Sequence, residues 1–339
     1  MMANTWLLSA YQADSHQAWV RWLSQNVVAD WQVFTLPGRH FRWRIRGNPL
    51  SWLDVLPAKP PEMLLATSMV DLATLKGIMP QLNGVRSCLY FHENQFAYPV
   101  SNQQHSSIDP QMVQLYSALA ADELAFNSQF NLDSFVAGVE ALLAKMPDHV
   151  PTSVGQRILD KARVLPVPVL PIEARPKRPL IVWPHRWEYD KNPERLVEIL
   201  TLLATEDVPF QLALLGARGK RPVPALELIR QRFANHIIAD GRVSRAQYQQ
   251  LLGEAQVVIS TAKHEFQGLA VLEAVSAGCI PVVPNDLCYV EQYPDSYRFN
   301  SNNEAVALIK QALAGELATV QVKPWLQSSL TSAWQKWLQ

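Results

Sequence analysis

Two glutamates, Glu265 and Glu273, flank a short segment with seven residues between them. The apolar run 257–261 before them predicts a buried strand, and the residues after Gly268 favour a helix that ends near Gly278. A helix that starts directly after a glycine presents free backbone N–H groups and the positive end of its dipole, which together favour anions. Ionised carboxylates accept hydrogen bonds from hydroxyl groups. Such a site fits a sugar linked to a nucleoside diphosphate, although an ordinary helix with two solvated glutamates remains the structural alternative.

A second polar segment, 184–193, follows another apolar run and contains Arg186 and Lys191. At the carboxyl end of a parallel strand these side chains would face the crevice in which such sheets bind ligands. A guanidinium and an ammonium group suit a diphosphate and can stabilise a departing nucleoside diphosphate. The alternative is a solvated loop with an Arg–Glu pair. Further along, Gly216 and Gly219 follow a strand-like run and form either a turn that admits a base or phosphate, or a plain turn.

In the first half of the chain, four polar residues directly follow the apolar run 86–91. They are His92, Glu93, Asn94 and Gln95. If this run is a strand, its carboxyl end delivers them to the ligand-binding edge of the sheet. His92 could then orient a sugar or an acceptor, and Glu93 could bind acceptor hydroxyls or amines. A buried structural histidine is the alternative.

The segment 38–47 interleaves four arginines with aromatic residues. Arg42 and Arg44 could contact phosphates, and Trp43 could stack on an unpaired base. The same alternation fits a strand with one solvated arginine face.

These residues are set in a regular alternation of apolar runs and helix-forming stretches, which predicts an α/β protein with parallel, doubly wound sheets. In the first half we expect strands at 6–10, 31–36, 63–67, 86–91 and 123–127, and helices at 16–26, 111–121 and 129–145. Five prolines between 166 and 179 predict a domain boundary, because proline interrupts central strands and stiffens linkers.

The composition is that of a globular protein with room for two domains: 339 residues, 48% hydrophobic and 18% charged, with a formal net charge of zero. The three cysteines have no metal-binding spacing and predict reduced thiols. The N-terminus does not resemble a signal peptide, and no apolar run approaches the length that spans a bilayer. We therefore expect a cytoplasmic protein.

The segment 265–273 resembles the Glu-x7-Glu signature of retaining glycosyltransferases of the GT4 family. The resemblance implies the GT-B fold, in which two Rossmann-like domains with doubly wound parallel sheets face a cleft. It implies that Glu265 contacts the transferred sugar, that Glu273 contacts the nucleotide ribose, and that the start of the intervening helix binds the donor. Further implied donor contacts are Arg186, Lys191, Gly216, Gly268 and Leu269.

The proline cluster indicates where the chain divides, and the same resemblance implies what each part does. We expect an acceptor-side domain at 1–168 and a nucleotide-sugar domain at 169–324, with a C-terminal helix at about 325–339 that crosses back to the first domain. The sequence contains no Asp-x-Asp motif, the usual metal–diphosphate ligand set of the other large glycosyltransferase fold. We expect no metal and no cofactor apart from the nucleotide sugar itself.

The run His92–Gln95 followed by Tyr98 and Pro99 resembles one branch of these enzymes, the glycosyltransferase-1 domain-containing branch, whose characterised activity is tRNA-queuosine α-mannosyltransferase. Further matching stretches are Ser15-His16 with Trp19, Leu36–Gly38 leading to Trp43-Arg44, 66–72, Phe126–Ser128 with Asn131, and 261–273 extended by 284–287. The loop 11–16 departs from the branch, because it lacks a glycine pair before Ser15.

This resemblance implies GDP-mannose as the donor and queuosine in tRNA as the acceptor, with no membrane and no obligate protein partner. Implied donor contacts in the first domain are Ser15 and His16. Implied acceptor contacts are Glu93, Asn94, Gln95, Asn127, Ser128, Arg42 and Arg44.

Two alternatives remain open. One is a GT4 enzyme that acts on a lipid or small-molecule acceptor, for which a basic amphipathic helix in the first domain would be expected. The other is a tRNA- or nucleotide-binding protein without turnover.

Overall fold

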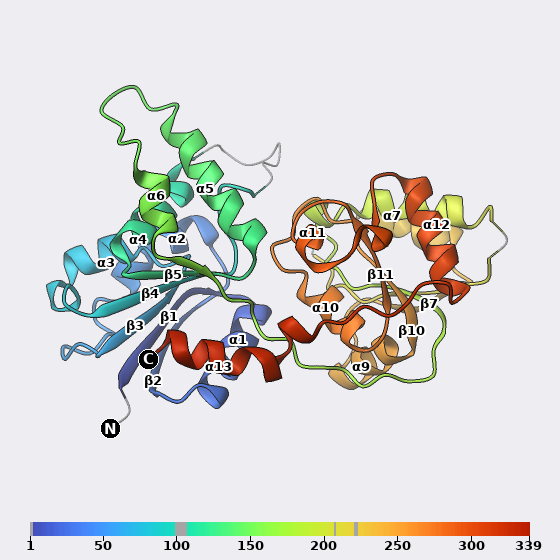
Figure 1. Ribbon diagram of the computed structural model, residues 1–339, viewed down its shortest axis with the longest axis horizontal. Helices are drawn as coiled ribbons and strands as arrows, with labels where there is room; N and C mark the ends of the chain where they lie inside the picture. Colours follow the sequence, from blue (N-terminus) through green and yellow to red (C-terminus); the bar gives the residue numbers. More distant parts are fainter. Residues whose placement is uncertain (1–2, 99–106, 207, 220–222) are drawn as a thin grey trace. The chain divides into compact units, whose positions relative to one another are not determined.

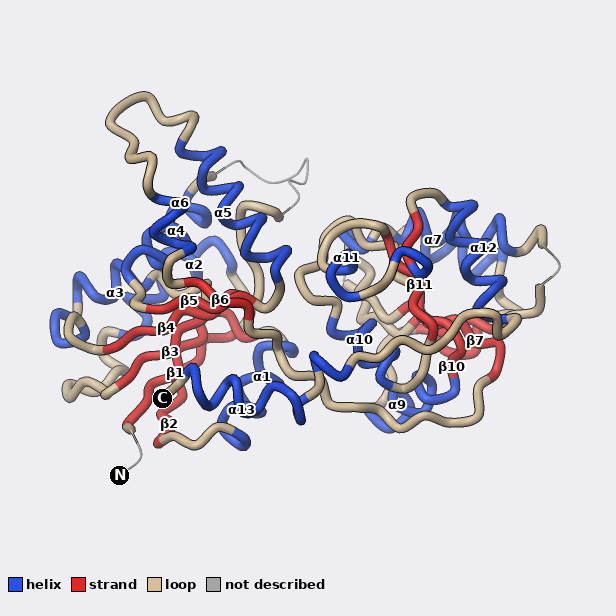
Figure 2. Tube along the Cα trace, viewed as in Figure 1, coloured by secondary structure: helices blue, strands red, loops and turns tan. Residues whose placement is uncertain are grey.

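The computed structural model describes residues 3–98, 107–206, 208–219 and 223–339, which form two compact units (Figure 1). Unit 1 comprises Met1–Pro168 and Ser328–Gln339, and unit 2 comprises Val169–Gln327. Each unit is built on its own parallel sheet with helices on both faces, so the predicted pair of doubly wound parallel sheets is confirmed (Figure 2).

The described strands of unit 1 form a sheet in the order β2-β1-β3-β4-β5-β6. Their bounds are β1 Asn4–Gln12, β2 Asp30–Pro37, β3 Met63–Thr67, β4 Arg86–Phe91, β5 Glu123–Phe126 and β6 Ala162–Val164. The helices are α1 Asp14–Asn26, α2 Phe41–Trp52, α3 Leu72–Ile78, α4 Asp109–Ala120, α5 Gln129–Leu143, α6 Val154–Leu159 and α13 Gln327–Trp337. Helices α2 to α6 cover one face of the sheet, and α1 and α13 cover the other (Figure 1).

The described strands of unit 2 form a sheet in the order β12-β11-β10-β7-β8-β9. Their bounds are β7 Arg178–Trp183, β8 Gln211–Leu214, β9 Ile237–Asp240, β10 Ala255–Ile259, β11 Ile280–Pro284 and β12 Arg298–Phe299. The helices are α7 Pro193–Leu203, α8 Pro224–Arg232, α9 Arg245–Glu254, α10 Leu269–Ser276, α11 Tyr289–Gln292 and α12 Asn302–Leu313. Strand β11 is buried along its whole length, as expected of a parallel strand covered on both faces.

The structure excludes one of the interpretations that the sequence left open for the segment 38–47. The segment 38–47 is not a strand, because residues from Phe41 onward form α2, and the apolar side chains that face the core recur at helical spacing (Ile45, Pro49 and Trp52). The chain divides between Pro168 and Val169, inside the proline-rich stretch, and Pro179 is already the second residue of β7. The ladder between β7 and β10 is irregular at this point, so the missing N–H group is tolerated there.

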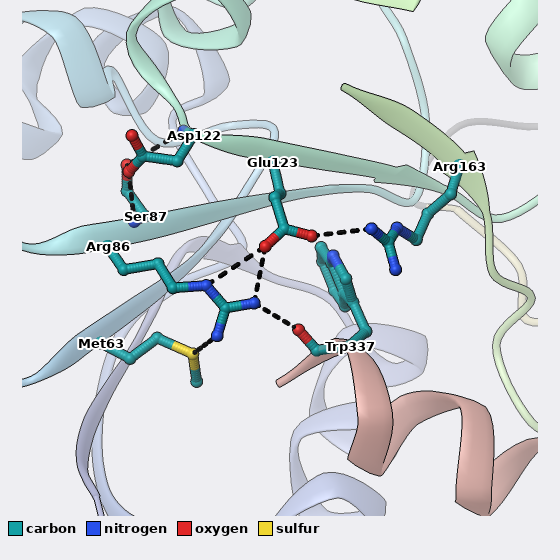
Figure 3. A network of polar contacts seen from close by, with 7 residues as sticks. All are labelled: Met63, Arg86, Ser87, Asp122, Glu123, Arg163 and Trp337. Atoms are coloured by element: carbon teal, nitrogen blue, oxygen red, sulfur yellow. Dashed lines mark hydrogen bonds and ion pairs between the residues drawn. The ribbon is translucent and has the colours of Figure 1, made fainter. Parts of the chain in front are cut away.

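The C-terminal helix α13 packs on unit 1 through aromatic side chains and one polar network. Trp334 contacts Tyr90 at 4.8 Å between ring centroids and donates a hydrogen bond to the carbonyl oxygen of Pro166. Arg86 pairs with Glu123 and also donates to the carbonyl oxygen of Trp337 at 2.9 Å (Figure 3). Because this network lies where β4 and β5 begin, it is at the sheet edge opposite to the one that carries the polar site residues.

Candidate active site

The centre of the unit 2 site is an ion pair between Lys191 and Glu265. Lys191 follows β7 and lies in a short 3-10 turn, and Glu265 lies in the loop between β10 and α10. The Lys191 Nζ is 3.2 Å from the Glu265 carboxylate and 3.2 Å from that of Asp190, and it donates to the carbonyl oxygen of His264 at 2.7 Å. An ammonium group has three donors. All three are therefore committed inside the unit, and Asp190 is a partner that the sequence did not single out.

The pair fixes the charge state of Glu265. Burial raises the pKa of this carboxyl group, but the Lys191 ammonium group and the backbone N–H of Gly268 outweigh burial and lower the pKa to about 2. Burial lowers the pKa of Lys191, and the carboxylates of Glu265 and Asp190 reverse this effect, so that it is raised. The Glu265 side chain is 21% exposed. It is thus an ionised acceptor with part of its surface open to a ligand.

A buried polar cluster packs next to the loop that contains Glu265. His185 Nε2 lies 2.8 Å from the hydroxyl oxygen of Ser260, and the Tyr289 hydroxyl donates to the same oxygen at 2.8 Å. Burial lowers the pKa of His185 to about 3, so its imidazole is neutral. The cluster joins the ends of β7 and β10 to α11. It positions neighbours of Lys191 and Glu265 without adding a charge.

The start of α10 has the geometry of an anion-binding helix start. Gly268 has a φ of +63°, and a Cβ at this position would lie 3.0 Å from Tyr289. Both the backbone conformation and the close approach favour glycine. The helix begins at Leu269, directly behind this glycine, so its first N–H groups lie beside Glu265.

Glu273 is held by the preceding helix. It accepts hydrogen bonds from the Arg245 guanidinium at 3.1 Å and from the Tyr248 hydroxyl at 2.9 Å, both on α9. Neither partner was identified from the sequence. Their spacing of three positions on one helix was the only available signal, and it does not indicate what the two side chains contact. The carboxylate retains lone pairs, so it can accept further hydrogen bonds from a ligand.

The remaining predicted donor residues of unit 2 have different roles. Arg186 is exposed and lies 3.3 Å from the Glu188 carboxylate, which is the Arg–Glu pair that the sequence left as an alternative. A Cβ on Gly216 would overlap the carbonyl oxygen of His185, whereas nothing lies within 4 Å of a Cβ on Gly219. Gly216 is therefore required by the packing of two loops of unit 2 against each other.

In unit 1, His92 lies at the carboxyl end of β4 against a cage of aromatic rings. His16 and Trp19 of α1 approach it with ring centroids at 4.3 and 4.5 Å, and Tyr90 at 4.7 Å. Burial is the main cause that lowers the pKa of His92 well below its usual value, so the ring is neutral. The structure brings together the predicted residues His16 and His92, since α1 meets the end of β4, while Ser15 is exposed in the first turn of α1.

Several predicted acceptor contacts have hydrogen-bond partners within unit 1. Asn94 is fully buried; its amide donates to Asn131 and Ser134, and its oxygen accepts from the backbone of Phe96 and Ala97. With every polar atom engaged, this side chain shapes the loop and does not face a ligand.

Asn127 and Ser128 also have partners within unit 1. Asn127 donates to the carbonyl oxygen of His92 at 2.8 Å, and Ser128 caps α5 by accepting the N–H of Asn131. By contrast, Glu93 and Gln95 are partly exposed on this loop. Pro99, which completes the motif in the sequence, lies outside the described residues.

Two separate sides of α2 carry the predicted arginines. Arg42 is exposed, while Arg44 is partly buried and its guanidinium lies 3.4 Å from the Ser51 hydroxyl. Of these two arginines, only Arg42 is exposed. Among the described residues, no helix combines the length and the apolar character that crossing a membrane requires.

Comparison with solved structures identifies the fold. The galactosyltransferase WaaB of the lipopolysaccharide outer core aligns with 98% of each chain at a TM-score of 0.65 and 11% identity. Sucrose-phosphate synthase from Thermosynechococcus elongatus gives a TM-score of 0.65 at 13% identity, covering 98% of this chain and 93% of that one. S. aureus TarM gives a TM-score of 0.59 at 12% identity, and the chain spans 58% of its length. The fold is the GT-B fold, as predicted.

Sequence comparison identifies the family. Residues 4–169 match the family described as tRNA-queuosine alpha-mannosyltransferase N-terminal, and residues 171–316 match glycosyl transferases group 1. A protein of Drosophila melanogaster named tRNA-queuosine alpha-mannosyltransferase is 33% identical over 314 residues, which cover 88% of this chain and 83% of that protein. The chain therefore belongs to the tRNA-queuosine alpha-mannosyltransferase family and is a glycosyltransferase.

Proposed function

We propose that this protein transfers mannose from GDP-mannose to the queuosine nucleoside of tRNA, and that the configuration at the anomeric carbon is retained. Family membership over most of the chain supports the acceptor. The observation that carries the chemistry is the ionised, partly exposed carboxylate of Glu265 beside the start of α10. An anion site next to a hydroxyl acceptor suits a sugar diphosphate.

The donor lies on unit 2. Its diphosphate binds at the first N–H groups of α10, from Leu269 onward, with Arg186 as the exposed cation. The N–H of Gly268 is already bonded to Glu265, whose carboxylate accepts hydrogen bonds from the sugar hydroxyls. Glu273, held by α9, accepts hydrogen bonds from the ribose.

Lys191 acts first by keeping Glu265 ionised and in place. A direct contact of Lys191 with the diphosphate requires one of its three present partners to be exchanged for a phosphate oxygen. Such an exchange places its charge where negative charge develops on the leaving group.

The acceptor lies on unit 1 near the end of β4, where His92 and Glu93 shape the site and the start of α1 brings Ser15 and His16 beside them. Queuosine offers hydroxyl groups to such a site. The acceptor hydroxyl attacks on the face from which the diphosphate leaves, and a phosphate oxygen takes its proton. No protein nucleophile takes part in this proposal.

One finding favours a second candidate, a lipid acceptor. The segment with the clustered arginines is a helix, and Trp43 and Leu50 are exposed on it. A basic helix with exposed apolar side chains is the feature expected for a lipid acceptor. The family comparison still supports tRNA, so the two acceptors need a direct test.

The test is mass spectrometry of nucleosides from queuosine-containing tRNA after incubation with the protein and GDP-mannose. UDP-glucose and UDP-galactose serve as parallel donors, and Glu265→Gln should lose transfer, while Glu316→Gln, an exposed carboxylate, is the matched control. Hexose on queuosine only with GDP-mannose supports donor and acceptor together. Release of the sugar by α-mannosidase and not by β-mannosidase supports retention. Addition of a hexose only from UDP-glucose or UDP-galactose would overturn the assignment of GDP-mannose as the donor. Addition to a lipid extract but not to tRNA would overturn the assignment of queuosine as the acceptor.

A further inference from the structure

The solvent-facing side of α2 carries an exposed indole that lies flat on the helix. Trp43 is 53% exposed, and a Cβ built on Gly47 would lie only 2.6 Å from its ring. The ring thus rests on the helix backbone at a glycine. Glycine inside a helix costs about 1 kcal/mol relative to alanine, so this position is not explained by helix propensity. The outer face of the indole remains open.

Helix α2 lies at the end of the sheet that holds the acceptor-side residues. Asn48 donates to the carbonyl oxygen of Met69 and accepts from the N–H of Asp71, and both of these follow the carboxyl end of β3. A Cβ on Gly38, just before α2, would lie 2.8 Å from the carbonyl oxygen of Gln12 at the end of β1. The helix therefore runs along the edge at which β4 delivers His92.

The charge of this surface is positive. Arg42 and Arg46 are both exposed, and the Arg46 side chain is 54% exposed although it pairs with Asp71 at 2.7 Å. Within the described part of the chain, no carboxylate lies at ion-pair distance from Arg42. Arg44 is on another side of the helix, against Ser51.

We propose that the solvent face of α2, formed by Arg42, Trp43, Arg46 and Leu50, is the surface that binds the RNA acceptor. Trp43 stacks on an unpaired base, and Arg42 contacts a phosphate. The inference rests on the proposed function, because it names the surface through which the tRNA reaches the acceptor site.

RNA fits this face better than a membrane surface does. The broad apolar side of α2, which includes Ile45, Pro49 and Trp52, is buried in the core of unit 1 and is unavailable to lipid. Interfacial helices insert such an apolar side between the acyl chains. The exposed face carries an aromatic ring between arginines, with Leu50 as its further exposed apolar side chain. An aromatic ring with arginines is the combination that binds single-stranded nucleic acid.

The experiment is fluorescence anisotropy with a labelled anticodon stem-loop RNA at several salt concentrations. Trp43→Ala should weaken binding about 10-fold, and Trp43→Tyr should restore most of it, because stacking tolerates a change of ring. Gly47→Ala keeps every side chain of the surface but displaces the indole, so it should also weaken binding. Arg42→Gln should reduce the slope of log K against log salt by about 0.8. Arg157→Gln, an exposed arginine on α6, is the matched control.

Transfer kinetics and a lipid arm complete the design. Trp43→Ala should raise KM for tRNA and leave KM for GDP-mannose unchanged. Unchanged RNA binding in Trp43→Ala, no RNA binding by the wild type, or Trp43-dependent binding to anionic vesicles without RNA binding would each overturn the inference. If the wild type binds RNA through Trp43 but transfers no sugar, the surface stands and the proposed reaction fails. If Trp43→Ala transfers mannose to tRNA with an unaltered KM for tRNA, the proposed reaction stands and the proposed surface fails.

Discussion

The ammonium group of Lys191 lies 3.2 Å from the carboxylate of Glu265, although 74 positions separate the two residues in the sequence. This buried group contains one positive charge and two negative charges, because the single ammonium group of Lys191 faces the carboxylates of both Glu265 and Asp190. The pair therefore ties the integrity of unit 2 to the ionisation of the proposed sugar contact.

Lys191→Met should abolish transfer and also destabilise unit 2. The change leaves two carboxylates in a buried site without their cation, and loss of one partner of a buried pair costs about 3 kcal/mol. Urea unfolding monitored by tryptophan fluorescence measures this cost. The double variant Lys191→Met with Glu265→Gln should recover part of the stability but none of the activity. Full stability in Lys191→Met would contradict the internal role of Lys191.

Stability should fall as the pH is lowered from 6.5 toward 5. His185 has a pKa of about 3 and His264 of about 4, both lowered mainly by burial, and the pKa of His92 is also lowered well below its usual value. The unfolded chain takes up protons below pH 6.5 while the folded protein does not. Each histidine thus contributes stability that is fully present above pH 6.5 and is lost as pH falls, by about 1.4 kcal/mol per pH unit.

The measurement for this pH dependence is the urea midpoint between pH 5 and 7. His185→Asn should reduce the slope of stability against pH by the contribution of one histidine. This holds whatever the substitution does to stability at pH 7. His149→Gln, an exposed histidine, is the matched control. An identical slope in wild type and His185→Asn would show that folding does not lower the pKa of His185.

Arg245→Ala should raise KM for the nucleotide sugar about 10-fold and change kcat little. Arg245 and Tyr248 hold the carboxylate of Glu273, and hydrogen bonds to a charged group contribute about 1.5–3 kcal/mol. Tyr248→Phe should act in the same direction. Steady-state kinetics with varied donor test this, with Gln250→Ala on the same helix as the control. A fall in kcat at constant KM would place Glu273 in the chemical step and not in donor binding.

The two glycines after β8 should differ sharply. Gly216→Ala places a Cβ on the carbonyl oxygen of His185, so the loop must move, and both thermal stability and donor binding should fall. Gly219→Ala meets nothing within 4 Å and should leave the melting temperature unchanged. Differential scanning fluorimetry of the two variants decides the matter. Equal melting temperatures would mean that the loop after β7 yields without cost.

The network of Figure 3 should control how firmly α13 is held. Arg86→Ala removes the hydrogen bond to the carbonyl oxygen of Trp337 and leaves Glu123 with Arg163 as its cation. Amide hydrogen exchange in 328–339 should then become faster, while exchange in β10 stays as in the wild type. Unchanged exchange in α13 would mean that the packing of Trp334 alone holds the helix.

The sequence by itself determined the sheets and the region of the site. Apolar runs covered on both faces identify parallel strands directly, so the expected strands 63–67 and 86–91 coincide with β3 and β4. The Glu-x7-Glu segment and its glycine are local in the chain, and their geometry follows from one strand, one loop and one helix start.

Only the tertiary structure decided how each polar side chain is used. The interleaved arginines of 38–47 fit both a strand and a helix, and the burial of Ile45 and Trp52 against the core selected the helix. Glu93 and Asn94 are both polar residues that directly follow β4 in the sequence. Asn94 is fully buried with all its hydrogen bonds internal, whereas Glu93 is partly exposed. Partners such as Asp190 for Lys191 and Arg245 for Glu273 depend on how loops and helices meet in space. A local pattern states which groups are present, whereas the desolvation and pairing that fix their charge and availability arise only when the chain is packed.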